Sequence, residues 1–414
     1  MTIKVLIVNT SDIEGGAARA AFRLHESLLL KNINSQMLVM KKLSDVTSVL
    51  GPENKFKKGL ARLRSILDYL PLKKYKNKTN HLFSSAWLPF SEVVEHINKI
   101  APDIVHLHWI AGGMIRIEDL AKIKAPIIWS LHDMWPFTGG CHYAENCNAF
   151  QKNCGNCPVL KADKKNDLSS KVFHRKQKTY NKKENITIIG LSNWLAQQAI
   201  SSSLFSQYQI INIPNPIDTK TFSAFDKTKA REIFNLPLNK NIILFGAIGA
   251  ASDPRKGFNQ LIEALNKIQN KNSELVIFGS NAPIENYILN KKTYYLGHLN
   301  TNEELRVLYS AADVMIVPSL QENLSNTIME SLACGIPVVS FNIGGNSDLI
   351  SHKVNGYLAT PYDTTDLAKG IDWILNASNY QQLSTAAREK VLSTFDSNLV
   401  ADRYITLYKN ILGK

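Results

Sequence analysis

Short apolar segments alternate with helix-like segments along the whole of this 414-residue chain. The apolar segments are rich in β-branched residues and resemble strands that are buried on both faces. Their alternation with helices predicts parallel sheets covered on both sides, and therefore an α/β fold. The expected strands are residues 3–9, 35–40, 103–109, 126–131, 186–191, 209–213, 241–246, 274–278, 293–296, 313–317 and 337–341.

A proline-rich break at residues 213–218 separates the expected strands of the first half from those of the second half. The length of the chain suits two domains of about 200 residues each. We therefore expect doubly wound, Rossmann-like domains at residues 1–215 and 216–394. Residues 395–414 carry apolar side chains near helical spacing, which predicts a closing amphipathic helix that packs back toward the N-terminal domain.

The formal net charge is +13, and the positive excess lies in two segments. Residues 53–81 and 161–183 together carry eighteen Lys and Arg against four acidic residues, so the rest of the chain is close to neutral. In the first segment, Leu and Ile recur near helical spacing among the cations, which is typical of a helix on an anionic membrane. A lysine-rich solvated surface is the alternative. No nucleic acid is expected as a partner, because no aromatic residues are interleaved in a recognisable binding motif.

No apolar segment approaches the length that spans a bilayer. The first nine residues enter a predicted strand without the features of a signal peptide. We therefore expect a cytoplasmic protein that associates peripherally with the inner face of the cytoplasmic membrane through the two basic segments.

Two glutamates lie eight residues apart in the stretch QENLSNTIMESLACGIPVV, at residues 321–339. On one continuous helix their side chains would be turned about 80° from each other and would not share a face. The spacing makes more sense with Glu322 in a loop and Glu330 in a helix that runs roughly over residues 327–333. Both acids can then line a pocket at the carboxyl edge of the sheet.

The start of this helix is a candidate anion site. Ser325 or Asn326 can cap the helix, and the backbone N–H groups of Asn323, Leu324 and Ser325 would point at an anion placed there. Two acids beside an anion site suit a hydroxyl-rich group attached to phosphate. A sugar nucleotide fits that description.

Polar groups also follow other expected strands. Gly15 and Gly16 open a helix after the first strand, so their amides can approach a phosphate, although a simple tight turn fits as well. The stretch Asp253-Pro-Arg-Lys-Gly257 opens a helix as well, so its cations can stabilise negative charge on a leaving diphosphate. His108 and His132 end neighbouring strands at the carboxyl edge, where active sites form.

These stretches belong to a longer ordered series. The series is Gly15-Gly16-Ala-Ala-Arg19, Ser130-Leu-His132-Asp133, Trp135-Pro-Phe-Thr-Gly-Gly-Cys-His142, Ser192-Asn-Trp194, Ile213-Pro-Asn-Pro-Ile-Asp218, Asp253-Pro-Arg-Lys-Gly257, Leu308-Tyr-Ser-Ala-Ala-Asp313, Glu322-x7-Glu330 and Ala333-Cys-Gly-Ile-Pro-Val-Val. In this order it resembles the glycosyltransferases of family 4, which have the GT-B fold, over nearly the full chain. The bacterial colanic-acid, exopolysaccharide and O-antigen enzymes are the most similar members.

The resemblance implies two Rossmann-like domains that face a central cleft. The C-terminal domain would bind a nucleoside-diphosphate sugar, and the N-terminal domain a lipid-linked or growing saccharide acceptor. Carried over by position, Glu322 contacts the donor sugar or its phosphate surroundings, Glu330 holds the ribose hydroxyls and Lys256 binds phosphate. The partner arginine of the family is replaced here by Ala250, which leaves open whether Arg255 substitutes for it.

In the N-terminal domain, the resemblance places Gly15 and Gly16 against the donor diphosphate and Arg19 near the acceptor. His132 matches the family histidine near the transferred sugar, so His132 and Glu322 are the expected catalytic residues. His108 lies either on the acceptor side or serves as a structural hydrogen-bonding group.

The family retains anomeric configuration, and no enzymic nucleophile is obvious in the chain. The expected mechanism is front-face attack by the acceptor hydroxyl, with the leaving diphosphate as proton acceptor. Enzymes that hold Mg²⁺ on a sugar nucleotide commonly use an Asp-x-Asp pair. None stands in this sequence, so no catalytic metal is expected.

The expected activity is hexose transfer in bacterial surface polysaccharide biosynthesis. A sucrose- or trehalose-type synthase with a soluble acceptor is one alternative, and a non-catalytic module that binds a nucleotide sugar or nucleic acid is another.

Four cysteines, Cys141, Cys147, Cys154 and Cys157, fall within 17 residues. The spacing of the last two is that of a zinc knuckle, and the other two can complete a tetrahedron with His142 as a spare ligand. We expect structural zinc. An iron–sulfur centre, reversible disulfides and plain thiols are the alternatives.

Overall fold

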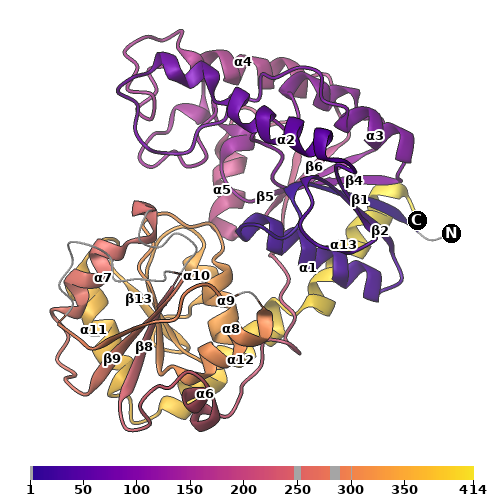
Figure 1. The fold of residues 1–414 in the computed structure, drawn as a ribbon. Helices are drawn as coiled ribbons and strands as arrows, with labels where there is room; N and C mark the ends of the chain where they lie inside the picture. The colour runs from indigo at the N-terminus through magenta and orange to yellow at the C-terminus, as the bar shows by residue number, and fades with distance from the viewer. Residues whose placement is uncertain (1–2, 247–252, 280–289, 300) are drawn as a thin grey trace. The chain divides into compact units, whose positions relative to one another are not determined.

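The computed structural model describes residues 3–246, 253–279, 290–299 and 301–414 (Figure 1). The chain divides into two compact units, Met1–Asn215 with Val400–Lys414 as unit 1 and Pro216–Leu399 as unit 2. Each unit has its own parallel sheet. The change from unit 1 to unit 2 at residue 216 falls inside the proline-rich segment at residues 213–218.

Unit 1 contains a seven-stranded sheet in the order β3-β2-β1-β4-β5-β6-β7. Strand β1 pairs in parallel with β2 on one side and with β4 on the other. The strand order therefore reverses at β1, and ligands of doubly wound sheets bind at such a point, beyond the carboxyl ends of the strands. The strands are β1 Lys4–Ser11, β2 Asn34–Lys41, β3 Val49–Leu50, β4 Ile104–Leu107, β5 Ile127–Leu131, β6 Ile186–Gly190 and β7 Gln209–Asn212.

Helices cover both faces of this sheet, because each face carries its own apolar core (Figure 1). Strand β1 shows how the sequence builds both: Leu6 and Val8 enter one core, while Val5 and Ile7 enter the other. The α-helices of this part of the chain are α1 Gly16–Leu30, α2 Lys55–Asp68, α3 Val93–Ile100, α4 Leu168–Tyr180 and α5 Asn193–Ser201, and the 3-10 helices are η1 Leu70–Lys74, η2 Ile117–Lys122, η3 Trp135–Phe137 and η4 Ala149–Gln151.

The last helix, α13 (Ser397–Leu412), packs into unit 1. Tyr404 and Tyr408 are buried in one of the unit 1 cores, and the Tyr408 hydroxyl lies 2.8 Å from Nδ1 of His106 in β4. The closing segment was expected to begin at Phe395. That residue lies instead in a core of unit 2, because its ring packs with the apolar residues of that unit before the chain crosses over.

Unit 2 contains a six-stranded sheet in the order β10-β9-β8-β11-β12-β13. Here the order reverses at β8, which pairs in parallel with both β9 and β11. The strands are β8 Asn241–Gly246, β9 Ser273–Phe278, β10 Thr293–Tyr295, β11 Val314–Val317, β12 Val338–Phe341 and β13 Gly356–Ala359. The helices are α6 Lys227–Ile233, η5 Pro254–Lys256, α7 Phe258–Leu265, α8 Asn302–Ala311, α9 Asn326–Ala333, α10 Asn346–Leu349, α11 Thr364–Leu375 and α12 Tyr380–Thr394.

The unit 2 sheet is also covered on both faces by apolar cores, one that includes Leu244 and one that includes Phe245. The predicted α/β class with two doubly wound parallel sheets is therefore confirmed. Every strand expected from the sequence is present, and two short strands, β3 and β13, were not expected. In the described part of the chain, no helix has the length and apolar character needed to cross a bilayer.

Candidate functional site

In unit 2, the candidate residues gather where the strand order reverses. The segment before α7 follows β8, and the segment with Glu322 follows the neighbouring strand β11. Two parallel strands that are neighbours across a reversal leave a crevice at their carboxyl ends. The acidic loop at residues 318–325 starts from that edge, and the cationic stretch at residues 253–257 lies beside this loop.

Two glycines hold the acidic loop in place. Gly257 has φ +72°, and a Cβ on it would lie 1.8 Å from the carbonyl oxygen of Pro318. Gly344, in the turn after β12, has φ +51°, and a Cβ there would lie 1.8 Å from the carbonyl oxygen of Glu322. The loop is also tied by Leu320, whose N–H donates to the Arg255 carbonyl at 2.7 Å. Sequence analysis missed both glycines as site residues, because their role depends on contacts with distant segments.

We expect Gly344→Ala to destabilise unit 2 by about 1–3 kcal/mol, since the added methyl group overlaps the Glu322 carbonyl and the backbone conformation disfavours side chains. Urea unfolding measures this effect. Gly59→Ala in α2 is the matched control, because a Cβ there meets nothing within 4 Å. Unchanged stability in Gly344→Ala would contradict this assignment.

Glu322 and Lys256 form an ion pair in this loop. The Lys256 Nζ lies 3.2 Å from Oε2 of Glu322, and the N–H of Asn323 donates to Oε1 of the same carboxylate at 3.2 Å. Both side chains keep some exposure, 28% for Lys256 and 15% for Glu322, so a ligand can reach them. The structure thus brings together an acid and a cation that are 66 positions apart in the sequence.

Arg255 has a carboxylate partner of its own. Its guanidinium donates to both oxygens of Asp253, at 3.0 and 2.7 Å. Burial alone would raise the pKa of Asp253, but the hydrogen bonds and charge of Arg255 hold it below the usual value. Arg255 therefore meets a phosphate only in competition with this carboxylate. Ala250, which stands where the family has an arginine, lies outside the described residues.

Helix α9 begins as the sequence indicated. The Ser325 side chain accepts a hydrogen bond from the Ile328 N–H, and Asn323, Leu324 and Ser325 are all buried or nearly so. Glu330 lies in the body of this helix and is 3% exposed. The Tyr309 hydroxyl on α8 donates to Oε2 of Glu330 at 2.9 Å. Tyr309 was not singled out from the sequence, although it positions one of the two expected acids.

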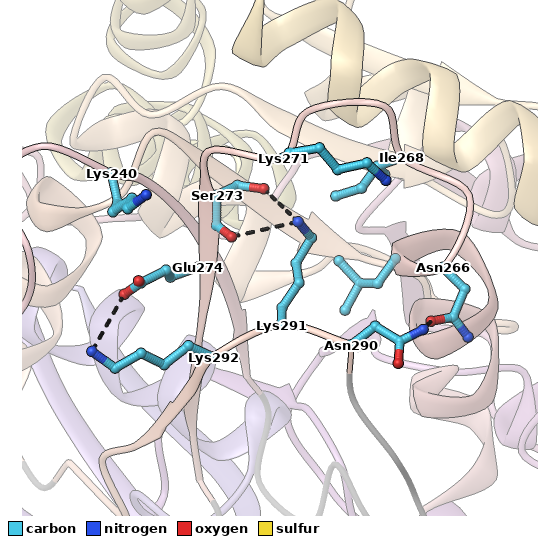
Figure 2. Close-up of a pocket in the computed structure, with 10 residues that line it drawn as sticks. Lys240, Asn266, Ile268, Lys271, Ser273, Glu274, Asn290, Lys291 and Lys292 are labelled. Carbon is cyan, nitrogen blue, oxygen red and sulfur yellow. Dashed lines mark hydrogen bonds and ion pairs between the residues drawn. The ribbon is translucent and has the colours of Figure 1, made fainter.

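The pocket shown in Figure 2 is a different feature of unit 2. It has a volume of about 270 Å³ and is lined by Lys240, Ser273 and Lys291, which precede or start strands β8, β9 and β10. It therefore lies at the amino-terminal edge of the sheet, opposite the candidate site. Two of its lysines already have protein partners, as the bond from Lys291 to Ser273 and the pairing of Lys292 with Glu274 show in Figure 2.

In unit 1, Gly15 and Gly16 mark the start of α1. Gly15 has φ +94°, a conformation that favours glycine, and no side chain caps the helix. Gly16 is exposed and Arg19 is half-buried on the first turn, and the Arg19 N–H donates to the Gly15 carbonyl at 3.0 Å. The first turn carries no acidic residue. These features leave an anion-compatible helix start beyond β1.

His108 and His132 lie against each other. His108 follows β4, His132 follows β5, and Nδ1 of His108 is 2.8 Å from Nε2 of His132. Burial lowers the pKa of His132 to about 4 and that of His108 well below its usual value, so both rings are neutral at pH 7. One ring must then donate the shared hydrogen and the other accept it, which fixes their tautomers together.

Asp133 accepts hydrogen bonds from side chains on both sides of it in the sequence. It accepts hydrogen bonds from the Trp109 indole at 2.8 Å and from Nδ1 of His142 at 2.6 Å. The other ring nitrogen of His142 lies 2.9 Å from the Ser84 hydroxyl. A metal could therefore take His142 as a spare ligand only in place of one of these two hydrogen bonds, and that role stays a prediction. Asp133 was not among the predicted site residues.

The four clustered cysteines form no disulfide, and two of them, Cys141 and Cys154, lie near the buried side chain of Lys176. Lys176 donates to the carbonyls of Trp135 and Thr138, and burial lowers its pKa to about 7. Burial raises the pKa of Cys154 to about 12 and that of Cys141 further still. Among the described residues, no group of three or more His, Cys, Asp or Glu is arranged to hold a metal ion.

The structure thus gives no support for structural zinc, which stays a prediction. Elemental analysis of freshly purified protein tests it, with one zinc per chain as the expected result. Protein that contains no zinc would end the idea.

The two basic segments differ in the structure. In residues 53–81 the cations of α2 are exposed or half-exposed. In residues 161–183, Lys176 and Lys183 are buried and Arg175 pairs with Glu118 at 2.6 Å. The second segment therefore offers fewer cations to a surface than its sequence indicated.

Comparison with known proteins points to one family. Residues 226–390, within unit 2, match the family model described as glycosyl transferases group 1. The chain is 26% identical over 352 residues to an uncharacterised glycosyltransferase of Methanocaldococcus jannaschii, a match that covers 78% of this chain and 87% of that protein. It is 25% identical over 239 residues to the capsular polysaccharide biosynthesis glycosyltransferase CapM of Staphylococcus aureus, covering 54% of this chain and 62% of that relative.

Solved structures share the whole fold. The sucrose-phosphate synthase of Thermosynechococcus elongatus has a TM-score of 0.69 at 18% identity, covering 99% of both chains. Anabaena HepE, solved in complex with UDP-glucose, has a TM-score of 0.64 at 16% identity, covering 99% of this chain and 100% of that one. At this level of identity the likeness establishes the fold, which is GT-B.

Proposed function

We propose that this chain is a family 4-like, retaining glycosyltransferase. It moves a hexose from a nucleoside-diphosphate sugar to a lipid-linked or growing saccharide acceptor in bacterial surface polysaccharide biosynthesis. The observation that carries the proposal is the Lys256–Glu322 pair beside the start of α9, at the strand-order reversal of unit 2. The match of residues 226–390 to glycosyl transferases group 1 and the likeness to CapM support it.

The residues of unit 2 would act on the donor. Lys256 exchanges its bond to Glu322 for the diphosphate and stabilises the charge that develops when the sugar leaves. Glu322 then accepts hydrogen bonds from sugar hydroxyls, and the amides of Asn323, Leu324 and Ser325 add positive dipoles. Glu330, held by Tyr309, accepts hydrogen bonds from the ribose.

In unit 1, His132 would contact the transferred sugar, Gly15 and Gly16 would face the diphosphate, and Arg19 would lie near the acceptor. His132 stays neutral and oriented by His108, so it offers a hydrogen bond to the sugar rather than a charge. The acceptor oxygen bonds to the anomeric carbon as the bond from that carbon to the phosphate oxygen breaks. The acceptor proton passes to the departing phosphate oxygen. No side-chain nucleophile takes part, and the product keeps the donor's anomeric configuration.

A thermal-shift panel of UDP-, GDP-, ADP- and TDP-sugars tests donor use. A donor at about 100 times its Kd should add about 2.7 kcal/mol of stability, so the right base will stand out. Transfer in the presence of EDTA then tests the expected lack of a catalytic metal, and its loss with rescue by Mg²⁺ would refute that expectation. If no nucleoside-diphosphate sugar stabilises the protein, the proposed function fails.

Membrane association is part of the same proposal. Helix α2 presents Lys55, Lys58 and Arg62 together with the exposed apolar side chains Leu60 and Leu63. We expect the protein to float with vesicles that contain phosphatidylglycerol and not with phosphatidylcholine vesicles. A soluble-acceptor synthase would float with neither.

A further inference from the structure

A column of aromatic rings runs from helix α13 to His132 in unit 1. Its rings are those of Tyr404, His106, His108 and His132. Their centroids are 5.1 Å apart from Tyr404 to His106, 4.5 Å from His106 to His108 and 5.1 Å from His108 to His132. Neighbouring rings pack against each other at these distances. The column therefore joins the last helix of the chain to the histidine that is expected beside the transferred sugar.

The alternation of side chains along two neighbouring strands produces this column. Residues 104, 106 and 108 follow one another at intervals of two along β4 and just beyond its end, so their side chains lie on one face of the sheet. Residues 128, 130 and 132 repeat the pattern on β5, which pairs with β4. Ile104 and Ile128 pack in the same core as Tyr404 and Tyr408 of α13. The polar side chains that follow them therefore lie on the face covered by α13.

His106 is fixed by hydrogen bonds at both of its ring nitrogens. Its Nδ1 lies 2.8 Å from the Tyr408 hydroxyl, and its Nε2 lies 2.8 Å from the Ser130 hydroxyl. The Ser130 hydroxyl in turn lies 3.1 Å from that of Tyr404. All four side chains are at most 1% exposed. A buried polar network of this kind specifies one arrangement of its side chains. It gives the His106 ring a single orientation, and α13 supplies two of its hydroxyls.

His108 depends on His106 for its own orientation. Its Nδ1 lies 2.8 Å from Nε2 of His132, whereas its buried Nε2 has no hydrogen-bond partner in the described part of the chain. A ring with a single hydrogen bond is oriented mainly by the groups that pack against it, and the His106 ring packs against His108 at 4.5 Å. A tilt of His106 would therefore move Nδ1 of His108. His132 would follow, and it is half-buried, so a ligand can reach it.

We propose that Tyr408 is a positioning residue for sugar transfer. Its hydroxyl orients His106, the His106 ring orients His108, and His108 orients His132 through their hydrogen bond. The inference rests on the proposed function, in which His132 contacts the transferred sugar. It adds that the last helix of the chain determines how this contact is made. Tyr408 touches no reacting atom. An apolar side chain could pack α13 against the sheet as well, but it could not fix the ring of a histidine.

Tyr408→Phe tests the proposal, because it removes the hydroxyl and keeps the ring. We expect kcat for transfer to fall about tenfold, with a smaller change in the KM for the donor, since a small displacement of a group at the reacting centre is costly. Tyr208→Phe is the matched control, because its hydroxyl donates to two backbone carbonyls in the other core of unit 1. It should keep the wild-type kcat. Ser130→Ala removes the other hydrogen bond of His106 and takes the place of Tyr408→Phe if that variant does not fold.

Two further measurements show whether Tyr408 acts through His132. In a double-mutant cycle, Tyr408→Phe should have no additional effect on kcat in a His132→Ala background, because groups that act as a unit are not additive. Proton–nitrogen NMR spectra of the histidine rings, assigned with single histidine variants, give a readout that does not depend on activity. Tyr408→Phe should shift the ring signals of His108 and His132 as well as those of His106. Tyr208→Phe should shift none of the three.

The outcomes separate a positioning role from a structural one. A loss of kcat that is equal with and without His132, or NMR shifts confined to His106, overturns the proposal. Wild-type kcat in both Tyr408→Phe and Ser130→Ala overturns it as well. A nucleotide-sugar panel without any response overturns the proposed function instead, and the NMR shifts then still decide whether the column orients His132.

Discussion

Lys256→Ala is expected to lower the rate of sugar transfer about 100- to 1,000-fold, the usual effect of removing one preorganised group that stabilises developing charge. The Lys256 ammonium lies 3.2 Å from Oε2 of Glu322, and the Lys256 side chain is 28% exposed. A diphosphate that leaves at this edge gains negative charge as the sugar bond breaks. The loss should therefore fall on kcat more than on KM.

Two other variants make the measurement specific. Lys271→Ala removes a cation at the edge of the pocket in Figure 2, at the other end of the unit 2 strands, and should leave the transfer rate unchanged. Arg255→Ala should have a smaller effect than Lys256→Ala, because Arg255 is bound through two hydrogen bonds to Asp253. If Arg255→Ala is instead the more damaging of the two, Arg255 replaces the arginine that the family carries at Ala250.

Steady-state kinetics with the donor chosen by the thermal-shift panel gives kcat and KM for each variant. Circular dichroism and unfolding midpoints show whether the variants fold alike. A Lys256→Ala rate within tenfold of the wild-type rate would remove Lys256 from the proposed chemistry and leave the acidic loop without a cation of its own.

The strands were predictable because their sequences are apolar on both faces, which few other structures tolerate. Strand β13 was missed since Gly356-Tyr-Leu-Ala is short and follows polar residues, and β3 has only two residues. The start of α9 was predictable from Ser325, whose hydroxyl provides a local cap. Each of these features depends on neighbours in the chain, and that is why the sequence reveals it.

The contacts within the candidate site depend on distant segments and were therefore less predictable. The need for glycine at Gly344 comes from the Glu322 carbonyl, 22 positions earlier in the numbering. His142 carries the ring nitrogens of a metal ligand, but Asp133 and Ser84 engage both. Lys176 and Lys183 look like surface cations in the sequence, and the fold buries their side chains. The residue type thus indicates what a side chain can bind, whereas the tertiary contacts determine which partner it has in the folded protein.

Mild acid is expected to destabilise the protein, because unit 1 buries several histidines in neutral form. Burial lowers the pKa of His25 and His132 to about 4 and that of His106 to about 3. The pKa of a histidine in the unfolded chain is about 6.5. The unfolded chain therefore takes up protons first as the pH falls. The contribution of these histidines to the free energy of unfolding is therefore complete above about pH 6.5. It is lost progressively as the pH falls toward about 4.

The expected size follows from proton linkage. Each such histidine costs about 1.4 kcal/mol per pH unit across this window, so at pH 5 each lowers the free energy of unfolding by about 2 kcal/mol. Asp12 and Asp133 also have lowered pKa values, since hydrogen bonds outweigh the effect of burial. The stabilisation that these two carboxylates provide is lost only when the pH falls below about 3.9, the pKa of Asp in the unfolded chain. It therefore does not change between pH 6.5 and pH 4.

Urea unfolding midpoints at pH 7.5 and pH 5, followed by fluorescence and by circular dichroism, measure the effect. His106 is the most informative position, because its ring nitrogens lie 2.8 Å from the Tyr408 and Ser130 hydroxyls and join α13 to the sheet. His106→Gln should reduce the difference in the free energy of unfolding between pH 7.5 and pH 5 by the contribution of one histidine. The same substitution at the exposed His96 should leave this difference unchanged. Equal midpoints at the two pH values would mean that protonation of the buried rings does not destabilise the folded protein. The neutral His108–His132 pair assumed in the transfer mechanism would then lose its basis.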